Sequence, residues 1–253
     1  MFRKILIANR GEIAVRIIRA ARELGIETVA VYSTADKEAL HTLLADEAVC
    51  IGPAKSTESY LNMSAVLSAA VLTGAEAIHP GFGFLSENSK FATMCEEVGI
   101  KFIGPSAKVM DMMGDKINAR KQMIKAGVPV IPGSDGEVYT AEEALEIAER
   151  IGYPVMLKAS AGGGGKGIRK VEKPEDLVAA FESASSEAQA AFGNGAMYME
   201  RVIYPARHIE VQILADQHGH VIHLGERDCS LQRNNQKVLE ESPSIAIGKT
   251  LRN

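Results

Sequence analysis

The amino-acid sequence predicts an α/β protein, in which an open parallel-sheet domain is followed by a second, α+β domain. Three observations predict this organisation. The first hundred or so residues alternate short apolar strands with amphipathic helices, which is the order that builds parallel sheets. Beyond about residue 150 most segments are strand-like, with one helix among them. A glycine-rich run, residues 162–167, lies between two of those strands.

The first predicted domain, residues 1–113, opens with a strand, a helix and a second strand. Ile5 to Ala8 is a continuous apolar run, residues 12–24 repeat apolar positions at helical spacing, and residues 28–32 are apolar again. Similar units follow, with helices over 64–72 and 88–98 and strands over 77–78 and 101–103. The arrangement is Rossmann-like, but the first turn, residues 9–12, holds one glycine where the dinucleotide fingerprint holds three, which argues against NAD binding.

Two turns of this domain are placed where ligands bind in open α/β sheets, at the carboxyl ends of strands. They are Asn9-Arg10-Gly11-Glu12 and the segment from His79 to Phe84. Tight-turn chemistry with core aromatic residues explains them as well as a contribution to a cleft does, so both interpretations stay open.

The second predicted domain covers residues 114–253. A helix over 108–126 carries Lys116 and is ended by Gly127-Val128-Pro129, after which a strand is expected. The other predicted helices cover 141–151 and 174–187, and the predicted strands cover 154–158, 168–171, 196–203, 208–214 and 220–224, with a hairpin turn at His218 and Gly219.

The glycine run matches G-x-G-x-x-G, but any run so rich in glycine would match it. It lies between two strands rather than between a strand and a helix, and Lys166 is followed by Gly167 instead of Ser or Thr, so neither the Rossmann nor the Walker pattern fits. Kinase motifs are absent. A glycine hairpin can close over a nucleotide because its backbone N–H groups approach phosphate oxygens closely. The alternative is a hairpin tip without a ligand.

Side chains near this hairpin favour the nucleotide. Lys158 ends an apolar strand directly before the loop, where an ammonium group can contact phosphates. In the strand 208–214, Ile209 and its alternate neighbours face one side, while His208, Glu210 and Gln212 face the other. That polar face is either solvated or part of a cleft. The charged stretch 226–233, interpreted as irregular and followed by Asn235 and Lys237, favours the cleft.

Composition excludes several classes of protein. The net charge of −4, with scattered basic residues, argues against a nucleic-acid partner. The apolar start is too short for a signal peptide or a membrane span. The cysteines Cys50, Cys95 and Cys229 show neither disulfide nor zinc spacing, and the histidines show no metal-ligand pattern. A cytoplasmic protein, with no membrane association and no metal ligands in this chain, is expected.

Three segments resemble the biotin carboxylase family: KILIANRGEIA at residues 4–14, HPGFGFLSEN at 79–88 and ERDCS at 226–230. The resemblance recurs from the start of the chain to near its end. It implies a preATP-grasp domain followed by an incomplete ATP-grasp domain, with a glycine-rich lid subdomain at about 131–203. It also implies that bicarbonate attacks ATP to give carboxyphosphate, which carboxylates biotin.

By this resemblance, Lys237 binds bicarbonate or carboxyphosphate, and the ATP site is formed by a larger set of residues. That set is Lys116, Lys158, Gly164, Gly165, Lys166, Glu200, Arg201, Ile203, His208, Gln232 and Asn235. Asn235 departs from the family, whose members carry His there. The implied ligands are ATP, Mg²⁺, bicarbonate and biotin.

The resemblance further implies a biotin carboxyl carrier protein and a carboxyltransferase component as partners, and a homodimer in the full-length form. The parent enzyme would be acetyl-CoA carboxylase, in fatty acid biosynthesis, or a related carboxylase. The metal-binding glutamates and the arginine that acts on bicarbonate and biotin are expected beyond Asn253, so this chain alone is expected to be inactive. Two alternatives remain: a non-catalytic ATP-binding fragment, and another ATP-grasp ligase, such as a carbamoyl-phosphate or purine-biosynthetic enzyme.

Overall fold

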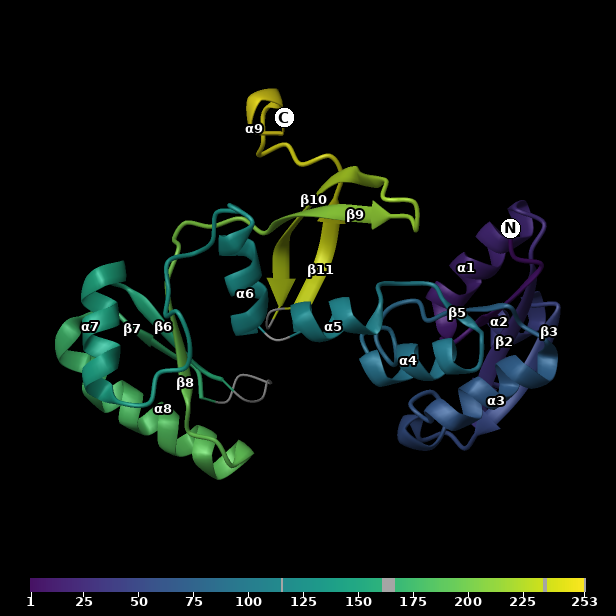
Figure 1. Cartoon of the computed structure of the whole chain (residues 1–253), viewed down its shortest axis with the longest axis horizontal. Coiled ribbons are helices and arrows are strands. Elements are labelled where there is room, and N and C mark those ends of the chain that lie inside the picture. Colours follow the sequence, from purple (N-terminus) through teal and green to yellow (C-terminus); the bar gives the residue numbers. More distant parts are fainter. Residues whose placement is uncertain (115, 161–166, 234–235, 253) are drawn as a thin grey trace. The chain divides into compact units, whose positions relative to one another are not determined.

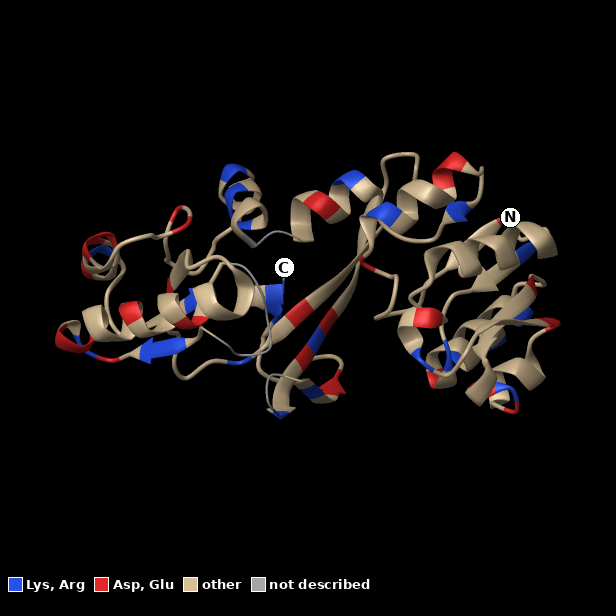
Figure 2. Ribbon diagram, turned by 90° about the horizontal axis from the view of Figure 1, so that it is seen from below, with Lys and Arg blue, Asp and Glu red and all other residues tan. Residues whose placement is uncertain are grey.

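The computed structural model describes residues 1–114, 116–160, 167–233 and 236–252, without the side chain of Lys116. The chain divides into two compact units, Met1–Val130 and Ile131–Asn253 (Figure 1). The predicted domain boundary between residues 113 and 114 stays a prediction, as does the lid subdomain. Lys and Arg residues are interspersed with Asp and Glu over both units (Figure 2). Among the described helices, none has the length and apolarity needed to cross a bilayer.

The first unit contains a parallel sheet of five strands, which confirms the predicted fold class. Ile5 pairs with Thr28 on one side and with Ala77 on the other, so the first strand is central. One edge strand, residues 47–52, was not predicted. The strand order is β3-β2-β1-β4-β5, with β1 (Lys4–Ile7), β2 (Glu27–Ser33), β3 (Glu47–Gly52), β4 (Ala77–His79) and β5 (Lys101–Phe102).

Helices cover both faces of this sheet because alternate residues of β1 point to opposite sides. Ile5 and Ile7 pack in the core beneath α1, whereas Leu6 and Ala8 pack in the core that α3 and α4 share. The predicted helix over 108–126 forms two helices, α5 and α6. The helical elements of the unit are α1 (Gly11–Glu23), η1 (Thr34–Asp36), α2 (Leu40–Leu44), η2 (Ser56–Glu58), α3 (Met63–Thr73), α4 (Ser89–Glu97), α5 (Ala107–Gly114) and α6 (Lys116–Lys125).

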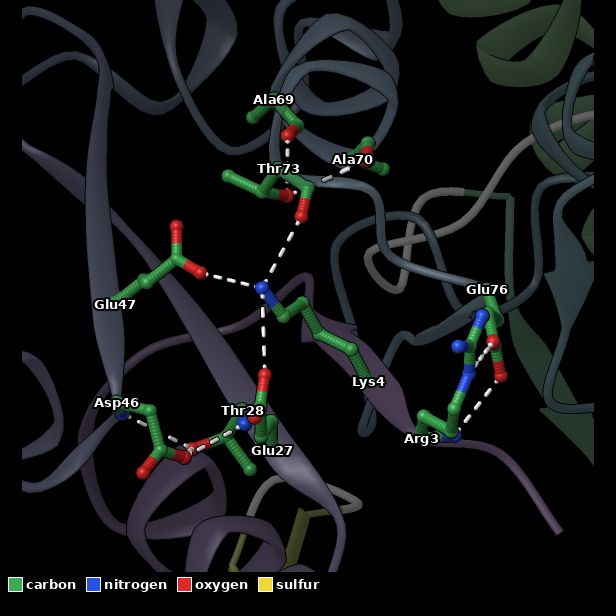
Figure 3. Close-up of polar contacts among 10 residues, drawn as sticks. All are labelled: Arg3, Lys4, Glu27, Thr28, Asp46, Glu47, Ala69, Ala70, Thr73 and Glu76. Atoms are coloured by element: carbon green, nitrogen blue, oxygen red, sulfur yellow. Dashed lines mark hydrogen bonds and ion pairs between the residues drawn. The ribbon is translucent and has the colours of Figure 1, made fainter.

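Ion pairs hold the amino-terminal edge of the sheet together. The Lys4 ammonium lies 2.6 Å from Glu47, 3.4 Å from Glu27 and 3.3 Å from the Thr73 carbonyl oxygen, so it joins the starts of three strands to the end of α3 (Figure 3). These carboxylates, Glu47 first, raise the pKa of Lys4. Arg3 pairs with Glu76 at 2.8 Å beside it. The opposite, carboxyl-terminal edge carries the turns that the sequence singled out.

The second unit begins with a three-stranded antiparallel sheet covered by two helices. The central strand β6 pairs with β7 and with β8, and Val155, Leu157 and Met199 lie in the core beneath α7 and α8. The glycine run therefore connects the two strands of an antiparallel hairpin, as predicted. The elements are α7 (Ala141–Ile151), β6 (Val155–Ala159), β7 (Arg169–Val171), η3 (Pro174–Asp176), α8 (Leu177–Phe192) and β8 (Met197–Arg201).

The strand expected after Pro129 does not form, so that prediction is wrong. The segment contacts β8 only through isolated bridges, Gly133 with Glu200 and Val138 with Met197. Prolines at 129 and 132 supply no N–H group for a ladder, and glycine weakens strand pairing. The segment still fixes the end of β8, because the Pro132 carbonyl accepts a 2.8 Å hydrogen bond from the Arg201 N–H.

A second antiparallel sheet follows, and it corrects another prediction. The stretch 226–233, expected to be irregular, forms the second half of one long strand. The expected end at residue 224 is instead a bulge, because the pairing register shifts between His223 and Glu226 around Gly225, whose φ is +88°. The order is β11-β10-β9, with β9 (Ile209–Ala215), β10 (Val221–Arg233) and β11 (Gln236–Glu241), of which β11 was not predicted.

This sheet exposes many aliphatic side chains. The segment after it is tied back to β10, since Arg252 pairs with Glu226 at 2.5 Å and Ser244 donates to Asp228 at 3.2 Å. A short helix, α9 (Lys249–Arg252), ends the described chain. The exposed aliphatic residues of the sheet are Val211, Ile213, Leu214, Val221, Ile222, Leu224, Leu231, Val238 and Leu239.

Candidate functional site

Lys158 lies near the end of β6, directly before the glycine hairpin, and its ammonium group forms an ion pair with Glu200 of β8. The strand register places Lys158 opposite Tyr198 and Glu200 opposite Met156, so the paired side chains are diagonal neighbours on one face of the sheet. Both are partly buried, with side-chain exposures of 32% and 22%. An ammonium group has three N–H donors, which leaves donors for a phosphate beside Glu200.

The other predicted residues of β8 follow at once. Arg201 is the last residue of β8, and its backbone is fixed by Pro132. Ile203 comes after the strand with half of its surface exposed. Between them, the Val202 N–H donates to the Pro154 carbonyl oxygen at 2.8 Å. Glu200 and Arg201 thus lie on the strand adjacent to the one that carries Lys158, and Ile203 lies just beyond the end of that strand.

A second group of predicted residues lies on the β9–β11 sheet. The register places Gln232 of β10 directly opposite Lys237 of β11. The Lys237 ammonium pairs with Glu210 of β9, and the His208 imidazole nitrogen Nε2 lies 3.5 Å from the same carboxylate. The structure therefore brings Gln232 and Lys237 together on one sheet, and His208 directly precedes its strand β9. The strands of this sheet carry both acidic and basic residues (Figure 2).

Glu210 is the centre of this second group. It also accepts hydrogen bonds from Arg227, the Nε bond measuring 2.7 Å. Lys237 and then Arg227 lower the pKa of the Glu210 carboxyl to about 2. The same contact raises the pKa of Lys237. The carboxylate is therefore ionised, and Lys237 protonated, throughout the physiological range.

Possible ligand atoms of Glu210, Cys229 and Glu240 lie within 4.8 Å of one another. This arrangement does not fit Mg²⁺, which prefers oxygen ligands, because one ligand is a thiol and Glu210 is already paired with two cations. Among the described residues this is the only group of three potential ligands so close together.

Several predicted site residues lie outside the described part of the chain. They are Gly164, Gly165, Lys166 and Asn235, together with the side chain of Lys116. Their proposed roles stay predictions.

In the first unit, the two singled-out turns meet where the strand order reverses, between β1 and β4. The buried Asn9 amide donates 2.7 Å hydrogen bonds to the carbonyl oxygens of Pro80 and Phe82. Gly81 has φ of +65°, and a Cβ there would lie 2.8 Å from the Asn9 amide nitrogen. Asn9 and Gly81 therefore fix the backbone at the position where open α/β sheets bind ligands.

A partly buried ionic cluster, in which the Arg10 side chain is half exposed, lies beside this turn. Arg10 pairs with Asp36 at 2.5 Å, and the Tyr60 hydroxyl donates to the same carboxylate at 2.6 Å. The Tyr60 ring stacks on Phe84 with centroids 5.1 Å apart. Phe84 is the single described non-glycine residue with positive φ, at +43°. The cluster thereby holds the end of the loop that follows β4.

Sequence reasoning missed Glu210 and Arg227 as site residues. The signal for Glu210 was present, because it shares the polar face of its strand with His208. Arg227 was not singled out because its segment was interpreted as irregular. Without a strand, the alternation of side chains does not predict which face Arg227 occupies.

Comparison with known proteins identifies family relationships over almost the whole chain. Residues 1–110 match the family "Biotin carboxylase, N-terminal domain". Residues 115–253 match the family "Carbamoyl-phosphate synthase L chain, ATP binding domain". Biotin carboxylase 1 of Bacillus subtilis is 59% identical over 252 residues, which are 100% of this chain and 56% of that protein. Biotin carboxylase of Haemophilus influenzae is 55% identical over 253 residues, with the same shares. The chain thus spans about half the length of these relatives.

The solved structures that this chain resembles belong to the same family as these relatives. A biotin carboxylase–β,γ-ATP complex from Campylobacter jejuni matches with a TM-score of 0.90 and 55% identity, covering 100% of this chain and 56% of that one. The biotin carboxylase domain dimer of Hydrogenobacter thermophilus 2-oxoglutarate carboxylase, in complex with MgADP, ADP and bicarbonate, matches with a TM-score of 0.88 and 54% identity, covering 100% and 55%.

Proposed function

This chain belongs to the biotin carboxylase family, and on that basis we propose that it carries the ATP-binding part of an enzyme that carboxylates biotin with ATP and bicarbonate. ATP would activate bicarbonate as carboxyphosphate, which then carboxylates a ureido nitrogen of biotin on a carrier protein. The solved relatives whose names include nucleotide and bicarbonate support this proposal.

The observation that carries the proposal is the placement of Lys158. Its ammonium group is fixed by Glu200 at the base of the glycine hairpin, on a partly buried sheet face. A phosphate that enters beneath the hairpin would meet a preoriented cation, and a charge-assisted contact of this kind is worth roughly 1.5–3 kcal/mol. Cations at this position neutralise charge on the transferring phosphoryl group.

The second group supplies the bicarbonate side of the proposed site. Lys237 would bind bicarbonate, while His208 and Gln232 would contact the nucleotide. Mg²⁺ would neutralise phosphate charge when bound, but the described acidic cluster does not fit it. We propose that the carboxylates that hold the metal follow after Asn253 in the parent protein.

We assign the partners and location by the same reasoning. The parent protein would act in the cytoplasm, as a homodimer, with a biotin carboxyl carrier protein and a carboxyltransferase component. Its acceptor would be acetyl-CoA, in fatty acid synthesis, or the substrate of a related carboxylase. Two plant relatives, from Populus trichocarpa and Arabidopsis thaliana, are named as chloroplastic.

Calorimetric titration of the chain with ATP tests the nucleotide site. Replacing Lys158 by Ala (Lys158→Ala) is expected to weaken ATP binding about tenfold or more, because the charge-assisted phosphate contact is lost. Lys170→Ala is the matched control, since Lys170 lies on neighbouring β7 and, among the described residues, forms an ion pair only with exposed Glu172, at 2.7 Å. Equal ATP affinity in the wild type and Lys158→Ala would contradict the proposed site.

A further inference from the structure

Asp228 of β10 has a buried carboxylate, 7% exposed, that accepts four hydrogen bonds. The Ser230 hydroxyl donates to its Oδ1 at 2.6 Å, and the Ser230 N–H donates to the same oxygen at 3.1 Å. The Ser244 hydroxyl and the Arg207 guanidinium group donate to its Oδ2 at 3.2 and 3.4 Å. These bonds, that of the Ser230 hydroxyl first, lower the pKa of Asp228, so the carboxylate is ionised at neutral pH. Because a buried charge requires its donors, the carboxylate holds the Ser230 hydroxyl in one direction.

Ser230 connects this carboxylate to the backbone of His208. A hydroxyl group has one proton to donate and two lone pairs that accept. The Ser230 proton is directed to Asp228, which leaves the hydroxyl oxygen as an acceptor, and the His208 N–H donates to it at 3.0 Å. The Cys229 N–H donates to the His208 carbonyl oxygen at 2.8 Å. Both backbone polar groups of His208 are therefore bonded to the two residues that follow Asp228.

These bonds lie where the regular pairing of the sheet is interrupted. The registered pairs of β9 with β10 end at Ile209 and Asp228, so His208 lies just before them. On the other side of β10, the register with β11 shifts between Asp228 and Leu231, which indicates a bulge. Ser230 lies within this bulge. The bonds of Asp228 and Ser230 thus supply an order to His208 that the ladder does not.

We infer that Ser230 is a positioning residue for the nucleotide, whose hydroxyl, oriented by Asp228, fixes the backbone of His208 and thereby the place of its imidazole ring. This inference rests on the proposed function, in which His208 contacts the nucleotide. It assigns Ser230 and Asp228 no contact with ATP. The His208 side chain is 49% exposed, so its place depends largely on the backbone that carries it.

Calorimetric titration of the full chain with ATP tests this inference. Ser230→Ala removes the acceptor of the His208 N–H, and the affinity for ATP is expected to fall about fivefold. Ser230→Thr keeps the hydroxyl and should bind ATP within about twofold of the wild type. Ser244→Ala is the matched control. It removes another hydroxyl that donates to Asp228, but the described hydrogen bonds of Ser244 do not involve His208, so ATP affinity should be unchanged.

A double-mutant cycle separates positioning from a general loss of structure. His208→Ala should weaken ATP binding, and adding Ser230→Ala to it should cause no further loss, because Ser230 acts only through the His208 side chain. A merely structural effect of Ser230 would instead multiply the two losses. Multiplied losses would overturn the inference, as would unchanged ATP affinity in Ser230→Ala or in His208→Ala, or an equal loss in Ser244→Ala.

The ATP titration with Lys158→Ala keeps the failure of this inference distinguishable from the failure of the proposed function. If the wild type binds ATP and Lys158→Ala weakens the binding, a failed cycle overturns the role of Ser230 alone. A wild type that binds no ATP, or a Lys158→Ala variant with unchanged affinity, would overturn the proposed nucleotide site and the inference with it.

Discussion

Asp36 shows how the surroundings of one side chain set its charge. Its carboxylate accepts hydrogen bonds from Arg10, Tyr60 and the Ser33 hydroxyl, the last at 2.9 Å. These bonds, with Arg10 contributing most, lower the pKa of Asp36 to about 2. In the unfolded chain the carboxyl regains its ordinary pKa near 3.8. The difference couples the stability of the first unit to pH.

A depressed pKa in the folded state stabilises the protein above the unfolded pKa, and that contribution is lost as pH falls through the folded value. We therefore expect a contribution on the order of 2 kcal/mol from Asp36 above about pH 4, which disappears toward about pH 2. Denaturant unfolding at several pH values measures it. In Asp36→Asn this acid-dependent loss should be absent, while Asp135→Asn, which removes an exposed ion pair with Arg150, should keep it. Identical acid profiles for wild type and Asp36→Asn would contradict the assignment.

At the residue scale the sequence singled out individual side chains but did not reveal which residues they contact. Lys158 could be singled out from the sequence because the features that mark it, an apolar strand before it and a glycine run after it, are its neighbours in the chain. Its partner Glu200 is 42 residues away, and only the pairing of β6 with β8 makes it a neighbour. Glu210 was recognisable as polar but not as central, because its partners Arg227 and Lys237 come from strands whose register the sequence does not reveal.

Among the elements, the contact between the segment 131–138 and β8 depends on a glycine. A Cβ at Gly133 would lie 2.6 Å from the Met199 carbonyl oxygen, which is backbone and cannot move aside easily. Gly133→Ala is therefore expected to destabilise the second unit by about 1–3 kcal/mol. Amide hydrogen exchange should show weaker protection at Ser134 and Arg201, whose N–H groups bond across this contact.

Gly136→Ala is the control for this prediction, because a Cβ there meets nothing within 4 Å. It should change neither stability nor exchange by a comparable amount. Equal losses of stability in Gly133→Ala and Gly136→Ala would contradict the prediction. The contact between this segment and β8 would then not depend on the close backbone approach at Gly133.

Elements with a strong local period were predictable, and those without one were not. The helix over 141–151 was predicted with the bounds that α7 has, because its apolar positions recur at helical spacing. The second half of β10 and all of β11 were missed. Their side chains are largely polar and exposed, and the bulge around Gly225 interrupts the alternation that identifies a strand.

At the scale of the whole molecule, each unit has cores of its own. The first unit is built around residues such as Leu6 and Phe91, and the second around Leu157 and Met199. Each unit is therefore expected to unfold as a separate cooperative transition. Leu157→Ala, which creates a cavity at a fully buried position, should lower the stability of one transition by roughly 2–5 kcal/mol.

Calorimetry of the two single variants checks this expectation. Leu6→Ala, at an equally buried position of the first unit, should shift the transition of the first unit and leave the transition of the second unit in place. A single transition that both variants shift together would show that the units unfold as one.

Phe84 places two requirements on a single position. A backbone with φ of +43° favours glycine, whereas the stack on Tyr60 requires an aromatic ring. Few amino acids satisfy both demands. The position therefore has little room for evolutionary drift, although its side chain lies partly in water.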